Sequence, residues 1–399
     1  MSSATALRAG EAPATPAPFR WAPVLAVALS TFSVVTAEMM PVGLLTPIAG
    51  ALGVAPGTAG TSLTITGVIA AVVAMFTPPL IGRADRRTVL VAFLALLALG
   101  NALSAVATSF AVFAAGRVLI GVAMGVVWSL AGGTGPRLAD ERHVGRAMTV
   151  IFSGVSIAMV AGVPLGTFAA DLWGWRAAFH GLAGLSLVAA GAVLITLPRL
   201  KVAHRSELRG MLTPLRHPGV ATGLVITALV VIGHFAAYTY VRPVLETGPG
   251  MTAMLIVAAL AVFGAAGVLG NFAIGALAAR DPRAALLIAL GGIAIAAALL
   301  PVAVAGAAAA LVVLALWGFT YGSVTVSTQS WIRVADPAQL ERSSGLWSGV
   351  FNGGIAVGAL LGGAVFDRTD GATVLWIAAG IVLAGLAVTL ARRPRTDRD

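Results

Sequence analysis

Twelve apolar stretches dominate the sequence, and each has the length of about 20 residues that an α-helix needs to cross a bilayer. We expect spans at 22–44, 57–81, 88–107, 110–131, 146–168, 177–197, 219–241, 252–278, 284–304, 306–330, 345–366 and 373–391. Only 10% of the residues are charged, against about 25% in a soluble protein. A membrane β-barrel would instead show short segments of alternating polarity. The sequence therefore predicts an all-α polytopic membrane protein.

The distribution of Lys and Arg predicts the orientation of the spans, because these residues accumulate in cytoplasmic loops. With both termini inside, nearly all of them fall on the cytoplasmic side. The exceptions are Arg117 within a span and, outside, Arg176, Arg242 and Arg368. This bias explains the net charge of +10 without nucleic acid as a partner. The absence of cysteine excludes disulfides, thiolate nucleophiles and cysteine metal sites, and we expect no cofactor.

The longest polar stretch, 198–218, predicts a cytoplasmic loop between two six-helix lobes at 22–197 and 219–391. Residues 1–21 lack the pattern of a cleavable signal and are expected, like 392–399, to form a cytoplasmic tail, the first of them disordered. Internal similarity supports the two lobes. The matching pairs are "RLAD" at 137–140 with "RVAD" at 333–336, Asp85 and Arg87 with Asp281 and Arg283, and "SGVSIAMVAGVPLG" from Ser153 with "SGVFNGGIAVGALLGG" from Ser348. Parallel six-helix repeats are typical of secondary transporters, whose substrate site lies between the lobes.

Three ionisable residues lie deep within the spans. Glu38 is about 16 residues into the first span, roughly 24 Å from the inner surface, and Arg117 lies roughly 10 Å below the outer one. With the repeat offset of 196 residues, the position that corresponds to Glu38 in the second half is His234, at a similar depth. Because a charge at depth costs about 2.5 to 3.5 kcal/mol, Glu38 is expected to face the interior and to carry protons across the membrane, with Arg117 and His234 beside it. The alternatives are a permanent Glu38–Arg117 ion pair and a Glu38 that is always protonated.

Pro41 and Gly43 follow Glu38 in the first span. Proline removes a backbone hydrogen bond and leaves a carbonyl free, so we expect a broken helix that lines a cavity and moves during gating. Both residues are, however, also commoner in membrane helices than in soluble ones. Tyr240 and Arg242, at the end of the seventh span, are interpreted as interfacial anchors.

Polar side chains elsewhere in the spans are candidate contacts for a solute, and His234 and Tyr238 share one helical face by their i, i+4 spacing. The candidates are Thr64, Thr66, Trp128, Ser129, His234, Tyr238, Asn271, Thr328, Gln329 and Asn352. Asn352 lies among glycines, which indicates close helix approach, so its amide could instead hold helices together.

Three short motifs recur at positions typical of one transporter family: "GRADRR" at 82–87, "RVLIGVAMG" at 117–125 and "GVPLG" at 162–166. They resemble motifs of the major facilitator superfamily, in particular of its twelve-helix drug:proton antiporters, and the resemblance covers residues 22 to 390. The resemblance implies that Gly82, Asp85 and Arg86 form a loop that latches the lobes at the inner face. It also implies that Gly162, Pro164 and Gly166 form the exporter motif of the fifth helix. This sequence departs from that motif at Val163, where a glycine is usual.

Within that family, "AEMMPVGLLTPIA" at 37–49, "VVWSLAG" at 126–132 and "GWRAAF" at 174–179 resemble both bacterial sugar efflux and purine ribonucleoside efflux transporters. The sequence thus predicts a monomeric proton-coupled antiporter of the bacterial inner membrane, which exports a sugar, nucleoside or drug by alternating access. A proton-coupled importer is an alternative, since a fold does not set direction. Another is a membrane receptor or scaffold without flux, although the short central loop supplies no signalling domain. No HExxH motif, cysteine nucleophile or nucleotide-binding loop suggests an enzyme.

Overall fold

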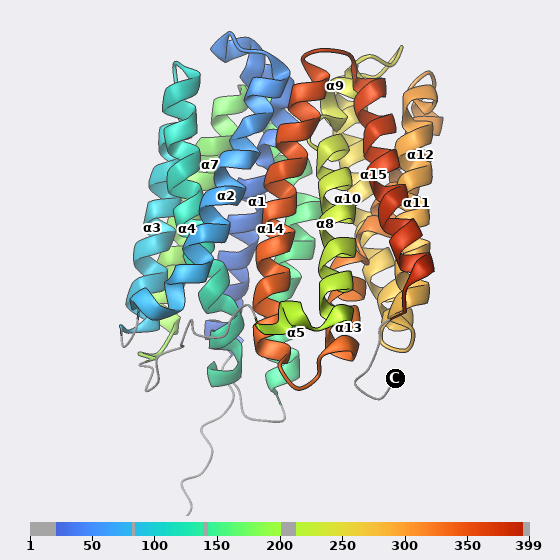
Figure 1. The fold of residues 1–399 in the computed structure, drawn as a ribbon. Helices are drawn as coiled ribbons and strands as arrows, with labels where there is room; N and C mark the ends of the chain where they lie inside the picture. The colour runs from blue at the N-terminus through green and yellow to red at the C-terminus, as the bar shows by residue number, and fades with distance from the viewer. Residues whose placement is uncertain (1–20, 82–83, 139–142, 201–212, 394–399) are drawn as a thin grey trace, which may run out of the picture.

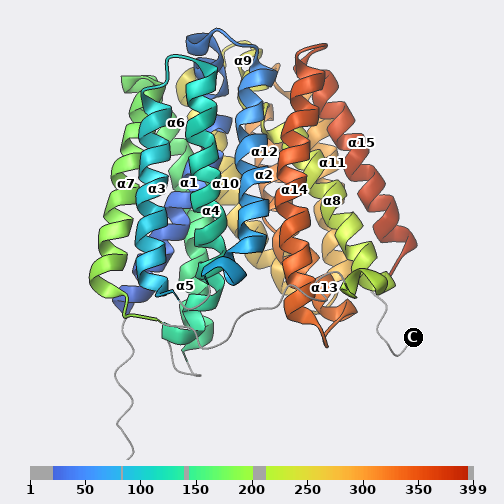
Figure 2. The same ribbon diagram turned by 60° about the vertical axis from the view of Figure 1, so that its left-hand side comes forward.

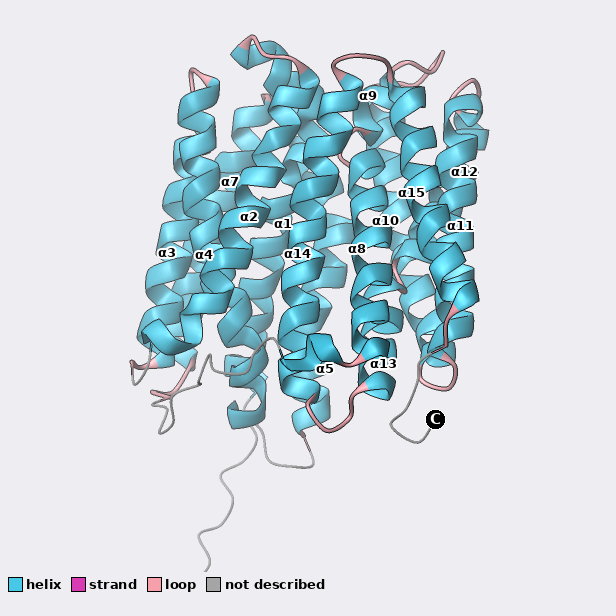
Figure 3. Cartoon of the chain, viewed as in Figure 1, coloured by secondary structure: helices cyan, strands magenta, loops and turns pink. Residues whose placement is uncertain are grey.

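The computed structural model describes residues 21–81, 84–138, 143–200 and 213–393. These residues form helices joined by short connections, without a strand among them (Figure 3). Twelve of the helical spans are long and apolar enough to cross a membrane, which confirms the predicted fold class. The tail before Trp21, loop residue Gly82 and most of the central loop lie outside the described residues.

Six spans come from the first half of the described chain. They are α1 (Trp21–Leu52), α2 (Pro56–Ile81), α3 (Arg86–Ala105), α4 (Phe110–Leu138), the series α5 (Val144–Ile157), η1 (Ala158–Gly162) and α6 (Val163–Trp173), and α7 (Trp175–Thr196). The second half opens with a short 3₁₀ turn, η2 (Thr213–Arg216). It continues with α8 (Pro218–Tyr238), α9 (Val241–Glu246), α10 (Ala253–Ala278), α11 (Pro282–Ala303), α12 (Ala307–Tyr321), α13 (Val324–Ala335), α14 (Leu340–Phe366) and α15 (Gly371–Ala391).

The sequence repeat is also a repeat of structure. α3 begins at residue 86 and α11 at 282, and α7 begins at 175 and α15 at 371, so both pairs are 196 residues apart. Asp85 and Asp281 are the N-caps of α3 and α11, and each carboxylate accepts a hydrogen bond from an amide of the first helical turn. α3 packs on α4 and α7 as α11 packs on α12 and α15.

Two spans depart from a single regular helix. In the fifth span a π-helical turn, η1, separates α5 from α6, and the Val163 amide bonds to the Ala158 carbonyl five residues back. Pro164 follows at the start of α6, where its missing N–H cannot continue the regular ladder. In the tenth span α12 ends at Tyr321 and α13 begins at Val324. Both stretches nevertheless remain candidate membrane spans, Arg146–Trp173 and Ala307–Ala335, as the sequence predicts.

Two sequence expectations are corrected. The predicted break of the first helix is wrong, because α1 continues through Pro41 and Pro47 to Leu52. The interpretation of Tyr240 and Arg242 as interfacial anchors is also wrong. The chain turns after Tyr238 into the short helix α9, and this turn buries both side chains at the contact between the halves.

The two halves meet along α2 and α14 and along α10, η1 and α6 (Figures 1 and 2). Apolar side chains of α1, including Val35, Met39 and Val42, join the core of the second half. α1 begins and α15 ends at the same face of the molecule, which we call the termini face (Figure 1). Residues on the other side, including the connection between α14 and α15, form the opposite face.

Candidate functional site

Arg117, on α4, is fully buried and bonds to backbone carbonyls. Its Nη1 donates to the Ala37 carbonyl at 2.7 Å, Nη2 to that of Glu38 at 3.0 Å and Nε to that of Ser62 at 3.3 Å. Ala37 lies four residues before Pro41, so its carbonyl is the one that the missing proline N–H leaves free. Arg117 therefore supplies the hydrogen bond that the Ala37 carbonyl would otherwise lack, which explains how α1 remains continuous through Pro41.

The Glu38 side chain is 5% exposed and lies beside this arginine without pairing with it. Its Oε1 has no hydrogen-bond partner, and no ion pair joins Glu38 to Arg117 within the part of the chain that the structure describes. The arginine contacts the backbone of Glu38 rather than its carboxyl group. In this conformation the carboxyl group is thus buried and near a positive charge but not fixed by it.

His234, on α8, lies in a group of aromatic rings in the second half. The Trp317 indole Nε1 donates to His234 Nδ1 at 3.1 Å, which assigns the neutral imidazole with its hydrogen on Nε2. The ring stacks on Tyr321 with centroids 3.4 Å apart and on Tyr238 at 5.0 Å. His234 is fully buried, and its Nε2 has no partner among the described residues.

Tyr321, which was not among the predicted site residues, belongs to the aromatic group around His234. It stacks on the imidazole ring with centroids 3.4 Å apart. It ends α12, at the interruption of the tenth span. The glycines on either side of "FTY", Gly318 and Gly322, were the available sequence signal.

The other predicted contacts are distributed over both halves. Thr64 donates to the Ala356 carbonyl of α14 at 2.9 Å, across the contact between the halves. Trp128 stacks on Phe152. The Asn352 amide bonds to the Ser348 carbonyl of its own helix, so it forms no bond between helices. The remaining candidates, Ser129, Asn271 and Gln329, are half-buried polar side chains.

Two more polar candidates are buried and have partners. Thr66 donates to the Ser62 carbonyl at 3.0 Å, next to the Arg117 contacts. Thr328 accepts a hydrogen bond from the Trp347 indole at 3.0 Å. Both therefore act as packing groups in this conformation.

The glycines of the "GVPLG" motif bring the fifth span against α1. A Cβ at Gly162 would meet Thr36, and one at Gly166 would meet Met40. On its other side the π turn faces the second half, because a Cβ at Gly264 of α10 would meet the Met159 carbonyl. The irregular turn before Pro164 thus lies between α1 and α10, at the contact between the halves.

The "GRADRR" loop contacts its own half. The Asp85 carboxylate accepts from the Leu200 amide at 2.8 Å, and the Arg86 amide donates to the Leu200 carbonyl at 3.2 Å. Partial desolvation raises the pKa of Asp85, but hydrogen bonds from the Leu200 and Arg87 amides outweigh it and hold the pKa below its usual value. In this conformation the described contacts of Asp85 lie within the first half, so it forms no latch between the lobes.

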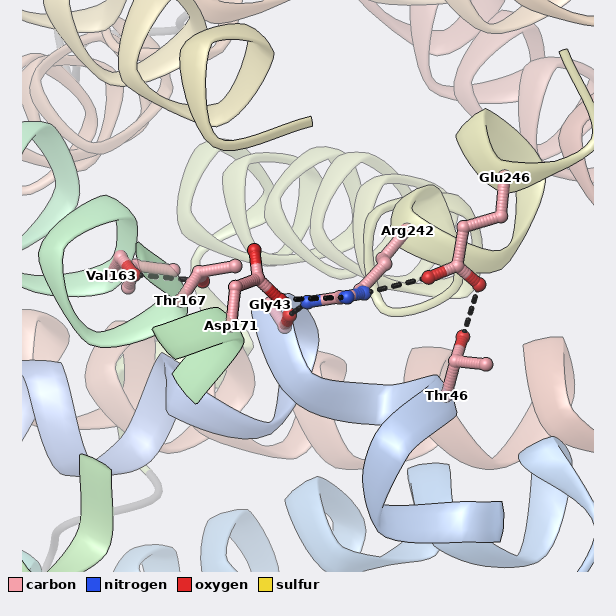
Figure 4. A network of polar contacts seen from close by, with 7 residues as sticks. All are labelled: Gly43, Thr46, Val163, Thr167, Asp171, Arg242 and Glu246. Atoms are coloured by element: carbon pink, nitrogen blue, oxygen red, sulfur yellow. Dashed lines mark hydrogen bonds and ion pairs between the residues drawn. The ribbon is translucent and has the colours of Figure 1, made fainter. Parts of the chain in front are cut away.

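Polar contacts between the halves gather toward the opposite face. Arg242 of α9 donates to the Gly43 carbonyl of α1 and pairs with Asp171 of α6 at 3.3 Å. Thr46 donates to Glu246 at 2.6 Å. Nearby, the Gly57 amide donates to Asp367 at 2.7 Å. The side chains around Arg242 are shown in Figure 4.

Comparison with known proteins identifies the family to which this arrangement belongs. Residues 27–339 match the family model of the Major Facilitator Superfamily. The chain is a member of that superfamily. The superfamily and a relative described as an efflux pump are those of a transporter rather than an enzyme, as the sequence predicts.

Two relatives match this superfamily member over most of its length. It is 31% identical to the purine ribonucleoside efflux pump NepI of Salmonella paratyphi B, over 93% of this chain and 94% of the relative. It is 34% identical to the transcription regulatory protein OpdE of Pseudomonas aeruginosa, over 93% of each.

Two solved structures share its fold. One is a bacterial homolog of the human lysosomal transporter Spinster, in an inward-facing and occupied conformation. It has a TM-score of 0.75 and 13% identity, and the match covers 94% of this chain and 97% of that one. The other is the nucleoside transporter NupG, with a TM-score of 0.75 and 15% identity over 93% and 99%. Both confirm the predicted fold of the superfamily.

Proposed function

We propose that this transporter is a proton-coupled antiporter that exports a small polar or amphipathic solute by alternating access. The observation that carries the proposal is the buried, unpartnered Glu38 carboxyl group, next to an arginine that backbone carbonyls already hold. A carboxyl group in a fixed ion pair would have little reason to exchange its proton. Glu38 keeps that freedom.

The coupling follows from the cost of moving a charge. A deprotonated Glu38 must be hydrated or face a cation, whereas the protonated group is neutral and is buried at lower cost. A proton from the outside would therefore favour closure around Glu38, and its release inside would favour the return with solute. Arg117 keeps its place throughout, because its three carbonyl contacts come from α1 and α2.

The surroundings of Glu38 and His234 contain few charged side chains, so the solute that suits them is neutral. The half-buried rings of Trp128 and Tyr321 would meet an apolar or planar group, whereas Tyr238 is buried and stacks on both His234 and Phe263. The half-buried amides of Asn271, Gln329 and Asn352 offer hydrogen bonds to hydroxyl groups. A nucleoside has both features, and the efflux pump named above is described by such a substrate. A sugar or an amphipathic drug shares part of them.

The bias of Lys and Arg supports a cytoplasmic location for both termini, and the bacterial relatives support the inner membrane. In this orientation export moves solute from the termini face to the opposite face. The proton-coupled importer would instead carry proton and solute together in the same direction, so protonation of Glu38 would accompany solute binding rather than alternate with it.

Reconstitution into liposomes with an imposed pH gradient tests the function. We expect gradient-driven flux of at least one of radiolabelled inosine, arabinose or a neutral amphipathic drug. Glu38→Gln should abolish gradient-driven flux and leave solute exchange, because the amide cannot release a proton. Asp281→Asn, at an exposed N-cap where asparagine also caps well, is the matched control and should transport normally. Full gradient-driven flux by Glu38→Gln would contradict the coupling.

A second candidate function is a membrane receptor without flux. The observation in its favour is the relative described as a transcription regulatory protein. Absence of flux for all three solutes, from well-folded protein that nevertheless binds one of them, would favour the receptor over the transporter.

A further inference from the structure

Arg242 stands out among the outward-lying cations because it is almost completely buried, at 6% exposure. Its guanidinium group contacts three acceptors. Nη1 donates to the Gly43 carbonyl, Nη2 pairs with Asp171 at 3.3 Å, and Nε pairs with Glu246 at 2.8 Å. Figure 4 shows these groups converging on the guanidinium plane. Such a planar fork suits several acceptors at once, which a lysine cannot reproduce.

The acceptor on α1 is available because of a proline. Pro47 lies four residues after Gly43 and has no N–H, so the Gly43 carbonyl lacks its usual partner within the helix. Arg242 takes that carbonyl from the other half of the molecule. This repeats the relation of Pro41, Ala37 and Arg117, but here the bond crosses between the halves.

The surroundings bring the acidic partners into place. Gly43 permits a close approach of α6, since a Cβ there would meet the Thr167 hydroxyl. Asp171 lies one turn further along α6 and reaches Arg242 on the same face. Glu246 uses its second oxygen to accept from Thr46 of α1 at 2.6 Å. Three bonds between the halves thus depend on one arginine and its neighbouring carboxylate.

We propose that Arg242, with the carbonyl freed by Pro47, is the latch that holds the opposite face closed. The role as a gate rests on the proposed alternating-access function. Opening of this face must separate α9 from α1 and α6 and so break all three bonds. It also hydrates the guanidinium and both carboxylates, which offsets part of the lost interaction. The interactions of Arg242 are therefore strong while water is excluded from them, and they weaken once water reaches the charged groups.

The latch is tested by thiol accessibility, for which the cysteine-free chain is suited. Val42→Cys is the reporter, because Val42 is fully buried in the core that joins the halves. A membrane-impermeant maleimide is applied to the opposite face of the purified, reconstituted protein. In the Arg242→Ala background the labelling rate should rise at least about tenfold, the effect of losing one partner of a buried charge cluster.

Pro47→Ala is the second variant and keeps the arginine. The new N–H competes for the Gly43 carbonyl, so labelling should rise by a smaller factor of about three. Arg368→Ala is the matched control, because the Arg368 guanidinium bonds to the Ala364 carbonyl at the end of the preceding helix, α14, at 2.8 Å, and it should leave the rate unchanged. Should Arg242→Ala fail to fold, Pro47→Ala decides.

An unchanged rate in the folded Arg242 variant would overturn the latch, as would an equal rise in Arg368→Ala. If Arg242→Ala does not fold, an unchanged rate in Pro47→Ala would overturn it. The measurement uses neither solute nor proton gradient. A rise in labelling together with no flux would therefore support the latch and contradict the proposed transport function. Failure of the latch and failure of the transport function are thus distinguishable.

Discussion

At the scale of single residues, α1 holds two prolines whose freed carbonyls are each taken by a buried arginine. For Pro41 this relation is testable by a double-mutant cycle. Arg117→Ala removes three hydrogen bonds to buried carbonyls and should cost about 2 kcal/mol, at the modest strength that such bonds have in membranes. Pro41→Ala supplies a helical N–H to the Ala37 carbonyl. In that background the cost of Arg117→Ala should fall by about 0.5 to 1 kcal/mol.

Thermal unfolding of the four proteins in detergent gives the measurement. The control is Arg368→Ala, which loses an exposed bond to the end of α14 and should shift the midpoint little. Equal losses from Arg117→Ala with and without Pro41 would show that the arginine does not serve the proline site.

Part of this residue-scale picture follows from the sequence. Depth arithmetic predicts that Arg117 and Glu38 lie together, and the Glu38 carbonyl does accept from the arginine. The peptide partners could not be predicted, because they depend on α1 remaining helical through Pro41. Arg242 was misinterpreted for a related reason. Its burial depends on the turn into α9, which hydropathy does not reveal.

At the scale of helices, the π turn of the fifth span packs directly against α10 of the second half. Gly264→Ala would place a methyl group against the Met159 carbonyl and should cost about 1 to 3 kcal/mol as overpacking. We expect a lower unfolding midpoint and slower transport, because α10 must shift away from η1.

Gly181→Ala is the matched control in α7, where a Cβ meets nothing within 4 Å. Its effect should be neutral or stabilising by up to about 1 kcal/mol, since alanine is the better helix former. Unfolding midpoints and initial transport rates of both variants decide the matter. Normal values for Gly264→Ala would show that α10 and η1 can move apart without loss of stability or transport.

The helices themselves were predictable from hydropathy, and most ends lie within a few residues of expectation. The internal breaks were not. The interruption between α12 and α13 lies where an apolar stretch gives way to glycine and hydroxyl residues, and η1 directly precedes Val163 and Pro164. Neither pattern by itself distinguishes a break from an unbroken span that contains small and polar residues. Pro41, by contrast, predicts a helix break from the sequence. The α1 helix continues because Arg117 donates a hydrogen bond to the Ala37 carbonyl that the proline leaves free.

At the scale of the whole molecule, the repeat in the sequence predicts the repeated packing, because caps such as Asp85 and Asp281 fix equivalent helix starts. The conformation was beyond such reasoning. Which bonds between the halves are formed depends on the relative positions of the two halves, and the same sequence must satisfy more than one arrangement if it transports.

The orientation of the molecule in the membrane follows from the distribution of Lys and Arg, which predicts that the termini face lies in the cytoplasm. Ala84→Cys lies on that face, in the connection between α2 and α3, and Thr369→Cys lies on the opposite face, between α14 and α15. Both positions are exposed, and the chain has no other cysteine. An impermeant maleimide added to intact cells should label Thr369→Cys alone, and permeabilised cells should label both. Labelling of Ala84→Cys in intact cells would reverse the orientation, and Arg242 would then guard the cytoplasmic entrance instead of the outer one.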